Sequence, residues 1–532
     1  MLSRDFLNRN ARLCGNSIAT ISSDGKVRHT FIEFKNRVNQ LANGLMALLD
    51  VGKGDRVAVL LRNMPEYLEL YYAIPQIGAV VVPINYRLSE REIEFIIKNS
   101  GAATIITQPD YIPMINSLRQ IHIGLRNFII VHGEAENYLE YESFINNYPA
   151  TEPDVDLSED DLMVLCYTSG TTSFPKGAML TQRNFSANTF NLSMVCPSYP
   201  GDVVLGCFPL FHVANAVFMK FFNTGATQIT SDFDSKTVCE IIQQEQPNFV
   251  WMPPSPFNFL VNYQEINKYD LSSVRYTVSG GGHFPLVIAK KLFEVFPILE
   301  YLFQGHGITE GTSFVGAVRI TRDNMDEIER VMGSVKGLRP GGCPMRLSQM
   351  PLVDVRIVDD EDNDAPEGIV GEVIYYGDNI MRGYWRNPGA TAETLKNGWL
   401  HTGDMGLKAG GYFFLMDRKK DMILSGDENI YSAEVEEVIM MHPAVLEVAV
   451  IGVPHEKWGE TVKAIIVPIS GVKITEEEII EHCKKYLASY KKPTSVDIWN
   501  DPLPRNPSGK VLKRELRRPF WESQVPPAKP EA

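Results

Sequence analysis

The residues from Tyr167 to Met179 combine small, hydroxylated and basic side chains in a way that suits phosphate binding. They read YTSGTTSFPKGAM and follow the apolar stretch Leu162 to Cys166. Glycine lets backbone N–H groups turn inward, hydroxyl groups add hydrogen-bond donors, and a lysine adds positive charge. We therefore predict that this loop binds the outer phosphates of a triphosphate. Its candidate ligands are Thr168, Ser169, Gly170, Thr171, Thr172 and Lys176.

The loop differs from two other phosphate-binding motifs. A Walker A loop ends in Gly-Lys-Ser/Thr, whereas here Lys176 precedes Gly177. A dinucleotide fingerprint needs a third glycine, but Gly305 and Gly307 are followed by Glu310 at that position. A Ser/Thr/Gly run is also typical of an ordinary mobile loop, so the prediction depends on motifs elsewhere in the chain.

Alternating strand and helix patterns position this loop and the later glycine-rich segments. The alternation predicts parallel sheets covered by helices, in which ligands bind just beyond the strands. In the first half we expect strands at Val57 to Leu61, Ala79 to Val82 and Ala103 to Thr107, and helices after Pro65 and the Ser89 to Glu92 capping box. Further on we expect strands at Phe249 to Met252, Val274 to Val278 and Tyr301 to Phe303, and a helix at Pro285 to Phe296.

The pattern changes towards the C-terminus. From about Val353, hairpin-like strands and turn residues predict a β-rich subdomain. After the charged link Asp417 to Asp421, strands and helices predict a compact α+β module of about 110 residues. In this module, Ser432 is expected to cap a helix that runs to Met441, and Thr475 and Glu478 form the capping box of a second helix.

Composition limits the class of protein. With 532 residues and 44% hydrophobic content, the chain should divide into two or more domains. Fifty-one basic and 65 acidic residues give a net charge of −14, which disfavours nucleic acid and anionic membranes as partners. The seven cysteines are scattered without metal-ligand spacing, which favours reduced thiols in a cytoplasm. Neither a secretory signal nor a transmembrane segment is predicted.

Three more segments add chemistry in chain order. Ser279 to Gly282 follows a strand and precedes a helix, so its backbone can approach a planar ligand closely, although a plain strand-to-helix turn has the same pattern. Gln304 to Glu310 reads QGHGITE, and Gly398 to Asp404 reads GWLHTGD. With YTSGTTSFPKGAM, their order and spacing resemble the adenylate-forming superfamily, which contains acyl-CoA synthetases, adenylation domains of peptide synthetases and beetle luciferases. The resemblance covers nearly the whole chain.

The resemblance implies that ATP is bound with Mg²⁺. Glu310 would bind the metal, Thr309 would touch the α-phosphate, and Asp404 and Arg418 would hold the ribose. The sequence departs from the family at His306, where the family usually has a tyrosine stacked on adenine. A turn histidine with a purely structural role remains the alternative at that position. The other residues implied at the nucleotide are Gly280, Gly281, Gly282, Gln304, Gly305 and Gly307.

The same resemblance implies two half-reactions performed by one mobile domain. Lys510, in the segment Leu503 to Lys510, would contact the attacking carboxylate and the α-phosphate, and Lys420 would lie at the hinge. Coenzyme A would approach past Ser425, Gly426 and Trp458. By themselves, a lysine near a C-terminus is usually a surface charge and a tryptophan is as often a core residue.

The acid would enter a pocket near Pro209 to Asn215 in a member of this family. We expect a closed pocket of medium size that suits a short- or medium-chain fatty acid, an alicyclic acid or an aryl acid. His212 would gate the pocket, although a core histidine is the alternative. The expected wall residues are His212, Val213, Trp251, Gly282, Gly305, Gly307 and Ser313.

The predicted fold is therefore α/β with a small mobile α+β domain at the C-terminus. Residues 1–417 form the N-terminal domain, with a β-rich subdomain at about 350–417, residues 418–421 form the hinge, and residues 422–532 form the mobile domain. The predicted function is an AMP-forming carboxylic acid:CoA ligase. The alternatives are an adenylate former with a carrier protein or other acceptor, and a non-catalytic nucleotide-binding homologue. The oligomeric state stays open, a homodimer included.

Overall fold

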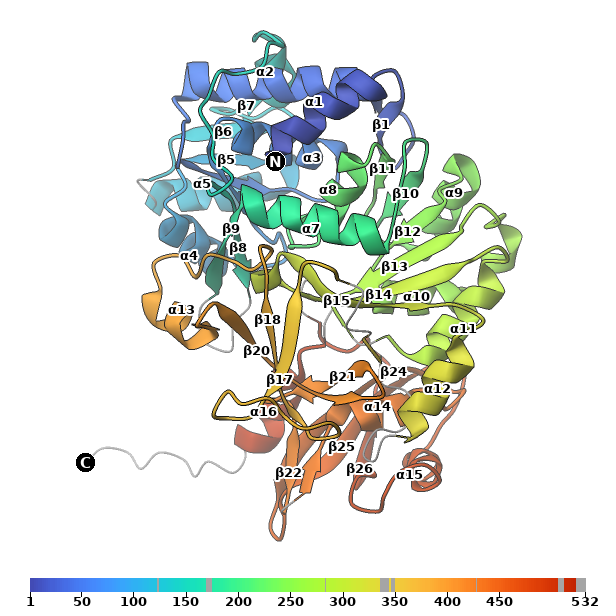
Figure 1. The fold of residues 1–532 in the computed structure, drawn as a ribbon. Coiled ribbons are helices and arrows are strands. Elements are labelled where there is room, and N and C mark those ends of the chain that lie inside the picture. Colours follow the sequence, from blue (N-terminus) through green and yellow to red (C-terminus); the bar gives the residue numbers. More distant parts are fainter. Residues whose placement is uncertain are drawn as a thin grey trace, which may run out of the picture.

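The computed structural model describes residues 1–121, 124–168, 175–282, 284–334, 344–345, 350–426, 428–505 and 511–522. Within these ranges the strands form four sheets. Two sheets with their helices make up the large upper part of the molecule in Figure 1, and the C-terminal sheet forms the small lower part. The remaining sheet lies between them.

The first sheet carries most of the predicted site. Its inner strands pair in parallel. At the two edges, β2 pairs with β1 and β15 pairs with β14 in antiparallel fashion. In spatial order they are β15 (Ser313–Ile320), β14 (Tyr301–Ile308), β13 (Tyr276–Gly280), β12 (Phe249–Trp251), β10 (Val203–Gly206), β11 (Thr227–Thr230), β1 (Ile18–Ile21) and β2 (Arg28–Thr30).

The second sheet ends in the hairpin that carries the phosphate-loop prediction. In spatial order it contains β7 (Leu139–Glu140), β6 (Asn127–Ile130), β5 (Thr104–Thr107), β3 (Arg56–Leu60), β4 (Val80–Pro83), β8 (Leu162–Thr168) and β9 (Lys176–Thr181). Thr168 at the end of β8 pairs with Lys176 at the start of β9. The residues between them, 169–174, lie outside the described part of the chain.

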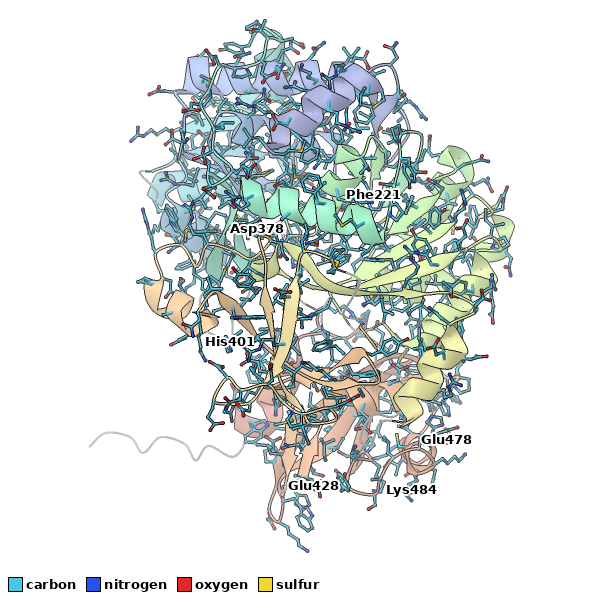
Figure 2. All side chains as sticks on the ribbon, in the orientation of Figure 1. Phe221, Asp378, His401, Glu428, Glu478 and Lys484 are labelled. Carbon is cyan, nitrogen blue, oxygen red and sulfur yellow. The ribbon has the colours of Figure 1, made fainter. Side chains whose placement is uncertain are left out.

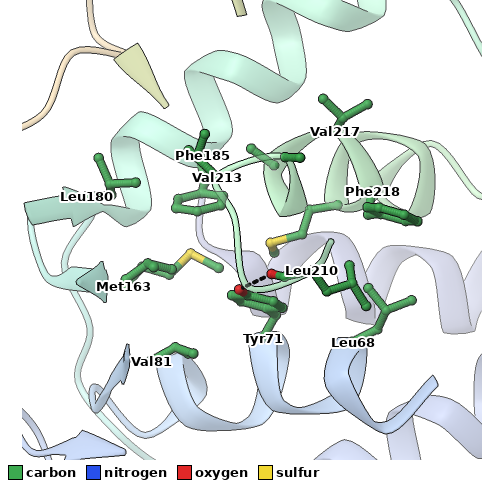
Figure 3. Close-up of a cluster of buried hydrophobic side chains, with 14 of the residues drawn as sticks. Leu68, Tyr71, Val81, Met163, Leu180, Phe185, Leu210, Val213, Val217 and Phe218 are labelled. Atoms are coloured by element: carbon green, nitrogen blue, oxygen red, sulfur yellow. Dashed lines mark hydrogen bonds between the residues drawn. The ribbon is translucent and has the colours of Figure 1, made fainter. Parts of the chain in front are cut away.

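Helices cover both sheets and bury a shared core. Figure 3 shows part of this core, where side chains from α3, α7, α8 and the second sheet point toward one another. The Tyr71 hydroxyl donates a hydrogen bond to the Leu210 carbonyl (2.7 Å), so a buried aromatic ring keeps its polar group paired. The helices of this part are α1 (Ser3–Leu13), α2 (Phe31–Leu49), α3 (Pro65–Gln76), α4 (Glu90–Ser100), α5 (Ile112–Ile121), α6 (Tyr141–Asn146), α7 (Gln182–Val195), α8 (Asn215–Asn223), α9 (Ser235–Glu245), α10 (Pro254–Val261), α11 (Leu286–Val295) and α12 (Met325–Ser334).

The third sheet is antiparallel and leads to the C-terminal part. It contains β16 (Pro344–Met345), β21 (Tyr412–Arg418), β20 (Trp399–Ala409), β18 (Gly371–Tyr376) and β17 (Asp354–Val358), with β19 (Leu395–Lys396) paired to β20 and helix α13 (Pro388–Thr394) beside it. The small part contains β22 (Ile423–Ser425), β23 (Glu428–Ile430), β24 (Val445–His455), β25 (Gly459–Pro468) and β26 (Ser495–Ile498), and the helices α14 (Ser432–Met440), α15 (Glu476–Lys484) and α16 (Lys513–Glu522). It has hydrophobic cores of its own.

The structure confirms the predicted α/β class with a β-rich subdomain and a C-terminal α+β part. Two local predictions were wrong. β14 continues to Ile308, because Gly305 and Gly307 pair with β15 rather than forming a loop. Ser432 is the first residue of α14 rather than its cap, and the Asp417 carboxylate accepts its N–H group at 2.7 Å.

Candidate active site

A cavity of about 310 Å³ lies where β14 meets β20, β21 and the small C-terminal part. Its volume is at the lower end of the range for small-molecule sites in proteins. The turn after β13 and the end of β14 contribute Gly281, Gly282 and Gln304 to Gly307. The third sheet contributes Asp404, Asp417 and Arg418, and the small part contributes Glu436, Arg505, Val511 and Lys513. Residues predicted from separate motifs therefore share one cavity.

His306 is held between two polar partners at this cavity. Its Nε2 lies 2.9 Å from Asp404 Oδ2, and its Nδ1 lies 2.9 Å from the Tyr375 hydroxyl. Burial raises the pKa of Tyr375, so the hydroxyl keeps its proton and can donate it. A carboxylate only accepts hydrogen bonds, so the arrangement favours the tautomer with the proton on Nε2, facing Asp404. His306 is thus oriented by the same carboxylate that was predicted to hold a ribose.

Asp404 and Arg418 are neighbours because of strand pairing. They lie opposite each other in the β20–β21 register, and Arg418 Nε is 3.3 Å from Asp404 Oδ1. The Asp404 side chain is 11% exposed and that of Arg418 is 38% exposed, so the ion pair is open to solvent on the arginine side. A carboxylate has about four lone-pair directions, which leaves acceptor capacity beside His306 and Arg418 for ligand hydroxyl groups.

Two residues predicted to bind the phosphates and the metal, Lys176 and Glu310, both lie next to Tyr384. The Tyr384 hydroxyl donates to Glu310 Oε1 at 2.6 Å, and Lys176 Nζ lies 5.0 Å from the centre of the Tyr384 ring. Burial, followed by the charge of Glu310, raises the pKa of Tyr384. Thr309 precedes Glu310 and is buried. The predicted ligands Ser169, Gly170, Thr171 and Thr172 lie outside the described residues, whereas Thr168 and Lys176 flank them.

The small part faces the cavity through the segment that was predicted to carry the adenylation lysine. Arg505 and Val511 both line the cavity and pair with each other through an isolated β-bridge. Arg505 Nη1 donates to Ser255 Oγ of α10 at 2.8 Å, and Nη2 donates to Glu447 Oε2 at 2.6 Å. Lys510 itself lies outside the described residues.

The predicted hinge, residues 418–421, begins at Arg418. Burial, followed by the charge of Arg418, lowers the pKa of Lys420. Arg517 of α16 donates to the Lys420 carbonyl at 3.2 Å. Asp417, the last residue before Arg418, accepts the N–H and hydroxyl groups of Ser432 and so contacts the start of α14. The hinge region is therefore hydrogen-bonded to two helices of the small part, α14 and α16.

The three residues expected near coenzyme A lie elsewhere. Ser425 pairs with Glu428, and Figure 2 shows Glu428 at the end of the small part that is remote from the large part. Gly426 donates its N–H to the Trp458 carbonyl at 2.7 Å, and Trp458 is 47% exposed. None of the three appears among the described residues that line the cavity.

The expected walls of the acid pocket divide into two groups. Gly282, Gly305 and Gly307 line the cavity. In the described part of the chain, His212, Val213, Trp251 and Ser313 do not line it. Val213 points into the packed cluster of Figure 3, and Trp251 stacks on Phe208 with ring centres 4.6 Å apart. Burial lowers the pKa of His212 to about 4, so this imidazole is neutral at neutral pH.

Four residues at the site had not been identified from the sequence. Tyr375 and Tyr384 lie in strands and turns without a recognisable motif, so their roles became visible only through their partners His306 and Glu310. Arg505 stands five residues before Lys510 in the same proline-rich segment, and this proximity was the available signal. Lys513 pairs with Glu436 at 2.7 Å inside the cavity wall.

Two family models match this chain. The model described as AMP-binding enzyme matches residues 7–385, and the model described as AMP-binding enzyme C-terminal domain matches residues 434–510. Among the described residues, no helix is both long and apolar enough to cross a membrane.

Curated relatives and solved structures agree with this match. A feruloyl-CoA synthase of Amycolatopsis sp is 37% identical over 506 residues, which cover 94% of this chain and 96% of that protein. A long-chain-fatty-acid–CoA ligase of Mycobacterium tuberculosis is 34% identical over 512 residues, 94% of this chain and 95% of that protein. The structure of the anthranilate CoA ligase AuaEII in complex with anthranoyl-AMP superposes with a TM-score of 0.87 at 25% identity, covering 98% of this chain and 97% of that chain.

Proposed function

The chain belongs to the AMP-binding enzyme family, and from this premise we propose how the described cavity serves its reaction. The protein is an AMP-forming acid–thiol ligase. It activates a carboxylic acid as the acyl-adenylate with release of pyrophosphate, and it then transfers the acyl group to coenzyme A with release of AMP. The residue roles given below are proposals.

The observation that carries the proposed nucleotide site is the fixed Asp404 carboxylate. His306 is hydrogen-bonded to one of its oxygens, Arg418 Nε lies 3.3 Å from the other as an ion pair, and all three residues line the same cavity. We assign Asp404 to the ribose hydroxyl groups, for which a carboxylate offers acceptors without a competing donor. Gly281 and Gly282 leave open backbone on which adenine would lie beside His306.

The triphosphate would extend from there toward Lys176, Thr309 and Glu310. Mg²⁺ in proteins is usually bound by one or two carboxylates together with substrate phosphates, and Glu310, fixed by Tyr384, fits this requirement. Glu310 would hold the ion, which when bound supplies positive charge against the phosphates. Lys176 and the hydroxyl groups of Thr168, Ser169, Thr171 and Thr172 would bind the outer phosphates.

The first half-reaction joins two anions. A carboxylate oxygen of the acid attacks the α-phosphorus of ATP, and the bond from that phosphorus to the oxygen bridging the β-phosphate breaks. Positive groups that are strongest where negative charge develops lower the barrier to such a step. We propose that Lys510 supplies this charge, because its neighbour Val511 and nearby Arg505 line the cavity.

The second half-reaction forms the thioester. The sulfur of coenzyme A bonds to the acyl carbon, the thiol proton is lost, and AMP leaves as the carbon–oxygen bond to its phosphate breaks. We propose that the described arrangement serves the first half-reaction, since Arg505 lines the cavity while Gly426 and Trp458 are not among the described residues that line it. Rotation about residues 418–421 would then exchange these two faces. The domain limits 1–417 and 422–532 remain part of this proposal.

A screen of acids with and without coenzyme A tests the proposal. AMP release is measured for linear, alicyclic and aryl acids of increasing size, since relatives act on feruloyl and long-chain fatty acyl groups. The expected result is AMP release that depends on both the acid and coenzyme A. Acid-dependent pyrophosphate exchange without stimulation by coenzyme A would instead point to a carrier protein or another acceptor.

A further inference from the structure

Strand β14 has two faces with different contents. His306 points to the cavity, where it meets Asp404 and Tyr375. Gly305 precedes His306 and faces the other way along the strand. The register with β15 shifts between His306 and Gly307, yet a Cβ atom added to either glycine would meet the same ring, that of Phe314. The nucleotide site and this second face are therefore separated only by the backbone of one strand. Thr309 and Glu310 follow directly after that strand.

The ring of Phe314 fills the second face. A Cβ atom added to Gly280 would lie 2.4 Å from Phe314 Cε1, and one added to Gly305 would lie 2.6 Å from three atoms of the same ring. A Cβ atom on Gly307 would lie 3.1 Å from Phe314 Cδ1. Three glycines on two adjacent strands thus form a slot that holds one phenyl ring. We call this the glycine slot, and it consists of Gly280, Gly305 and Gly307.

The glycine slot continues into a row of aromatic rings with unpaired polar atoms. Trp251 meets Phe314 edge to face at 5.6 Å, and Phe208 links Trp251 to His212. Trp251 Nε1, His212 Nδ1 and Asn188 Oδ1 are buried without a hydrogen-bond partner in the described part of the chain, and Asn188 also contacts the Phe314 carbonyl at 3.3 Å. Buried polar atoms usually have a hydrogen-bond partner, so these three atoms leave hydrogen-bonding capacity beside the aromatic rings.

The reaction places the acid on this face. Its carboxylate must reach the α-phosphate near Thr309, and the His306 face of β14 is taken by the nucleotide. The rest of the acid then extends along the other face, toward the glycine slot. We propose that Phe314 determines which acid is used: its ring occupies the space of an acid's own ring, so the enzyme activates short aliphatic acids and rejects aryl acids. This inference rests on the proposed function.

Truncation of Phe314 tests the inference by opening the slot. The wild type, Phe314→Ala and the milder Phe314→Leu are compared for coenzyme A-dependent AMP release with butanoate, hexanoate, benzoate and cinnamate. We expect the wild type to favour the aliphatic acids, and Phe314→Ala to raise kcat/KM for the aryl acids about tenfold or more. The KM for ATP should stay within about twofold, because β14 separates the slot from the nucleotide.

Phe218→Ala is a matched control. A Cβ atom on Gly206 of the same sheet would lie 2.2 Å from the ring of Phe218 on α8, so this pair is a second close glycine–phenylalanine contact. Gly206 lies on β10, two strands from β13, and Gly206 and Phe218 are absent from the described lining of the cavity. Phe218→Ala should lower stability without changing the preference among acids. Equal shifts in both variants, or a wild type that uses benzoate as well as butanoate, would overturn the inference.

A binding measurement separates this inference from the ligase assignment. Benzoyl-sulfamoyl adenosine, a stable mimic of an aryl adenylate, is titrated calorimetrically into the wild type and each Phe314 variant. Tighter binding to Phe314→Ala or Phe314→Leu than to the wild type supports the slot even if turnover is lost. Equal binding refutes it. If no acid releases AMP from any variant while the binding difference persists, the proposed reaction fails and the slot assignment stands.

Discussion

We expect the proposed nucleotide site to depend most on Asp404, because His306 Nε2 lies 2.9 Å from one of its oxygens and Arg418 Nε lies 3.3 Å from the other. Asp404→Asn keeps the shape but replaces one acceptor with a donor. We expect the KM for ATP to rise about tenfold to a hundredfold, the range for lost hydrogen bonds to a charged group. Acid-dependent pyrophosphate exchange at varied ATP measures it. Asp360→Asn, which changes a carboxylate that is 87% exposed, should leave KM unchanged. An equal effect of both variants would contradict the ribose assignment.

His306 departs from the tyrosine that is usual in the family, and we expect this difference to change the affinity for ATP rather than to abolish activity. A tyrosine there would offer a larger ring for stacking on adenine but would lose the contact between Nε2 and Asp404. For His306→Tyr we expect the KM for ATP to fall about threefold, with kcat changed less than about threefold. Initial rates at saturating acid and coenzyme A give both constants. An unchanged KM would show that the residue at this position does not contact the base.

His212 should make the free energy of unfolding depend on pH. Its pKa is lowered from 6.5 to about 4, so the unfolded chain binds a proton that the folded protein does not bind between these values. This contribution to stability is therefore complete above pH 6.5 and is lost as pH falls toward 4. Because the side chain is not fully enclosed, we expect about 1 kcal/mol of loss at pH 5. His212→Asn should lose less stability than the wild type between pH 7.5 and pH 5 in urea unfolding, and equal losses would contradict the cause given.

At the scale of elements, β14 and Phe314 form one packing unit. Gly305→Ala would place a methyl group 2.6 Å from the Phe314 ring, and overpacking of this kind costs about 1–3 kcal/mol. Phe314→Ala would remove the obstacle, so the double variant should be more stable than the sum of the single effects predicts. Thermal unfolding of the four proteins without ligand measures this coupling. Additive effects would show that the two side chains do not compete for the same space.

Local rules predicted those elements whose signals lie within a few residues. The capping boxes at Ser89 and Thr475 are present as expected, because each needs only a glutamate three residues later. The start of α14 could not be predicted in this way, since its N–H groups are bonded by Asp417, 15 residues upstream. Likewise, the extension of β14 through two glycines depends on pairing with β15, which no local propensity reveals.

The site shows the same limit. Motif resemblance predicted part of the lining of the described cavity, including Gly305, His306, Asp404 and Arg418, but not Arg505 or Lys513. It did not show that Phe314 fills the face behind Gly305, since that contact joins residues through space across two strands. The resemblance also implies that Trp458 lies near the acceptor; in the described arrangement this side chain is exposed and is not among the described residues that line the cavity.

At the scale of the molecule, the two half-reactions should respond separately to the small part. Lys510→Ala is expected to reduce pyrophosphate exchange by about a hundredfold or more, because the charge opposite the α-phosphate is lost. Thioester formation from supplied acyl-AMP should remain close to the wild-type rate. Single-turnover assays of each step test this. Lys484→Ala, which changes an exposed lysine of α15, should alter neither step. Equal loss in both steps for Lys510→Ala would contradict the two-orientation mechanism.

The opposite faces of β14 also bear on how such an enzyme changes over evolutionary time. One face carries His306, whose Nε2 contacts Asp404, and the other meets a single phenylalanine from β15. With the role proposed for Phe314, a single-base change in its codon would alter which acids the enzyme uses without changing the residues proposed to bind ATP. Descendants of a duplicated gene could diverge in the acids they consume while inheriting the same energy source unchanged.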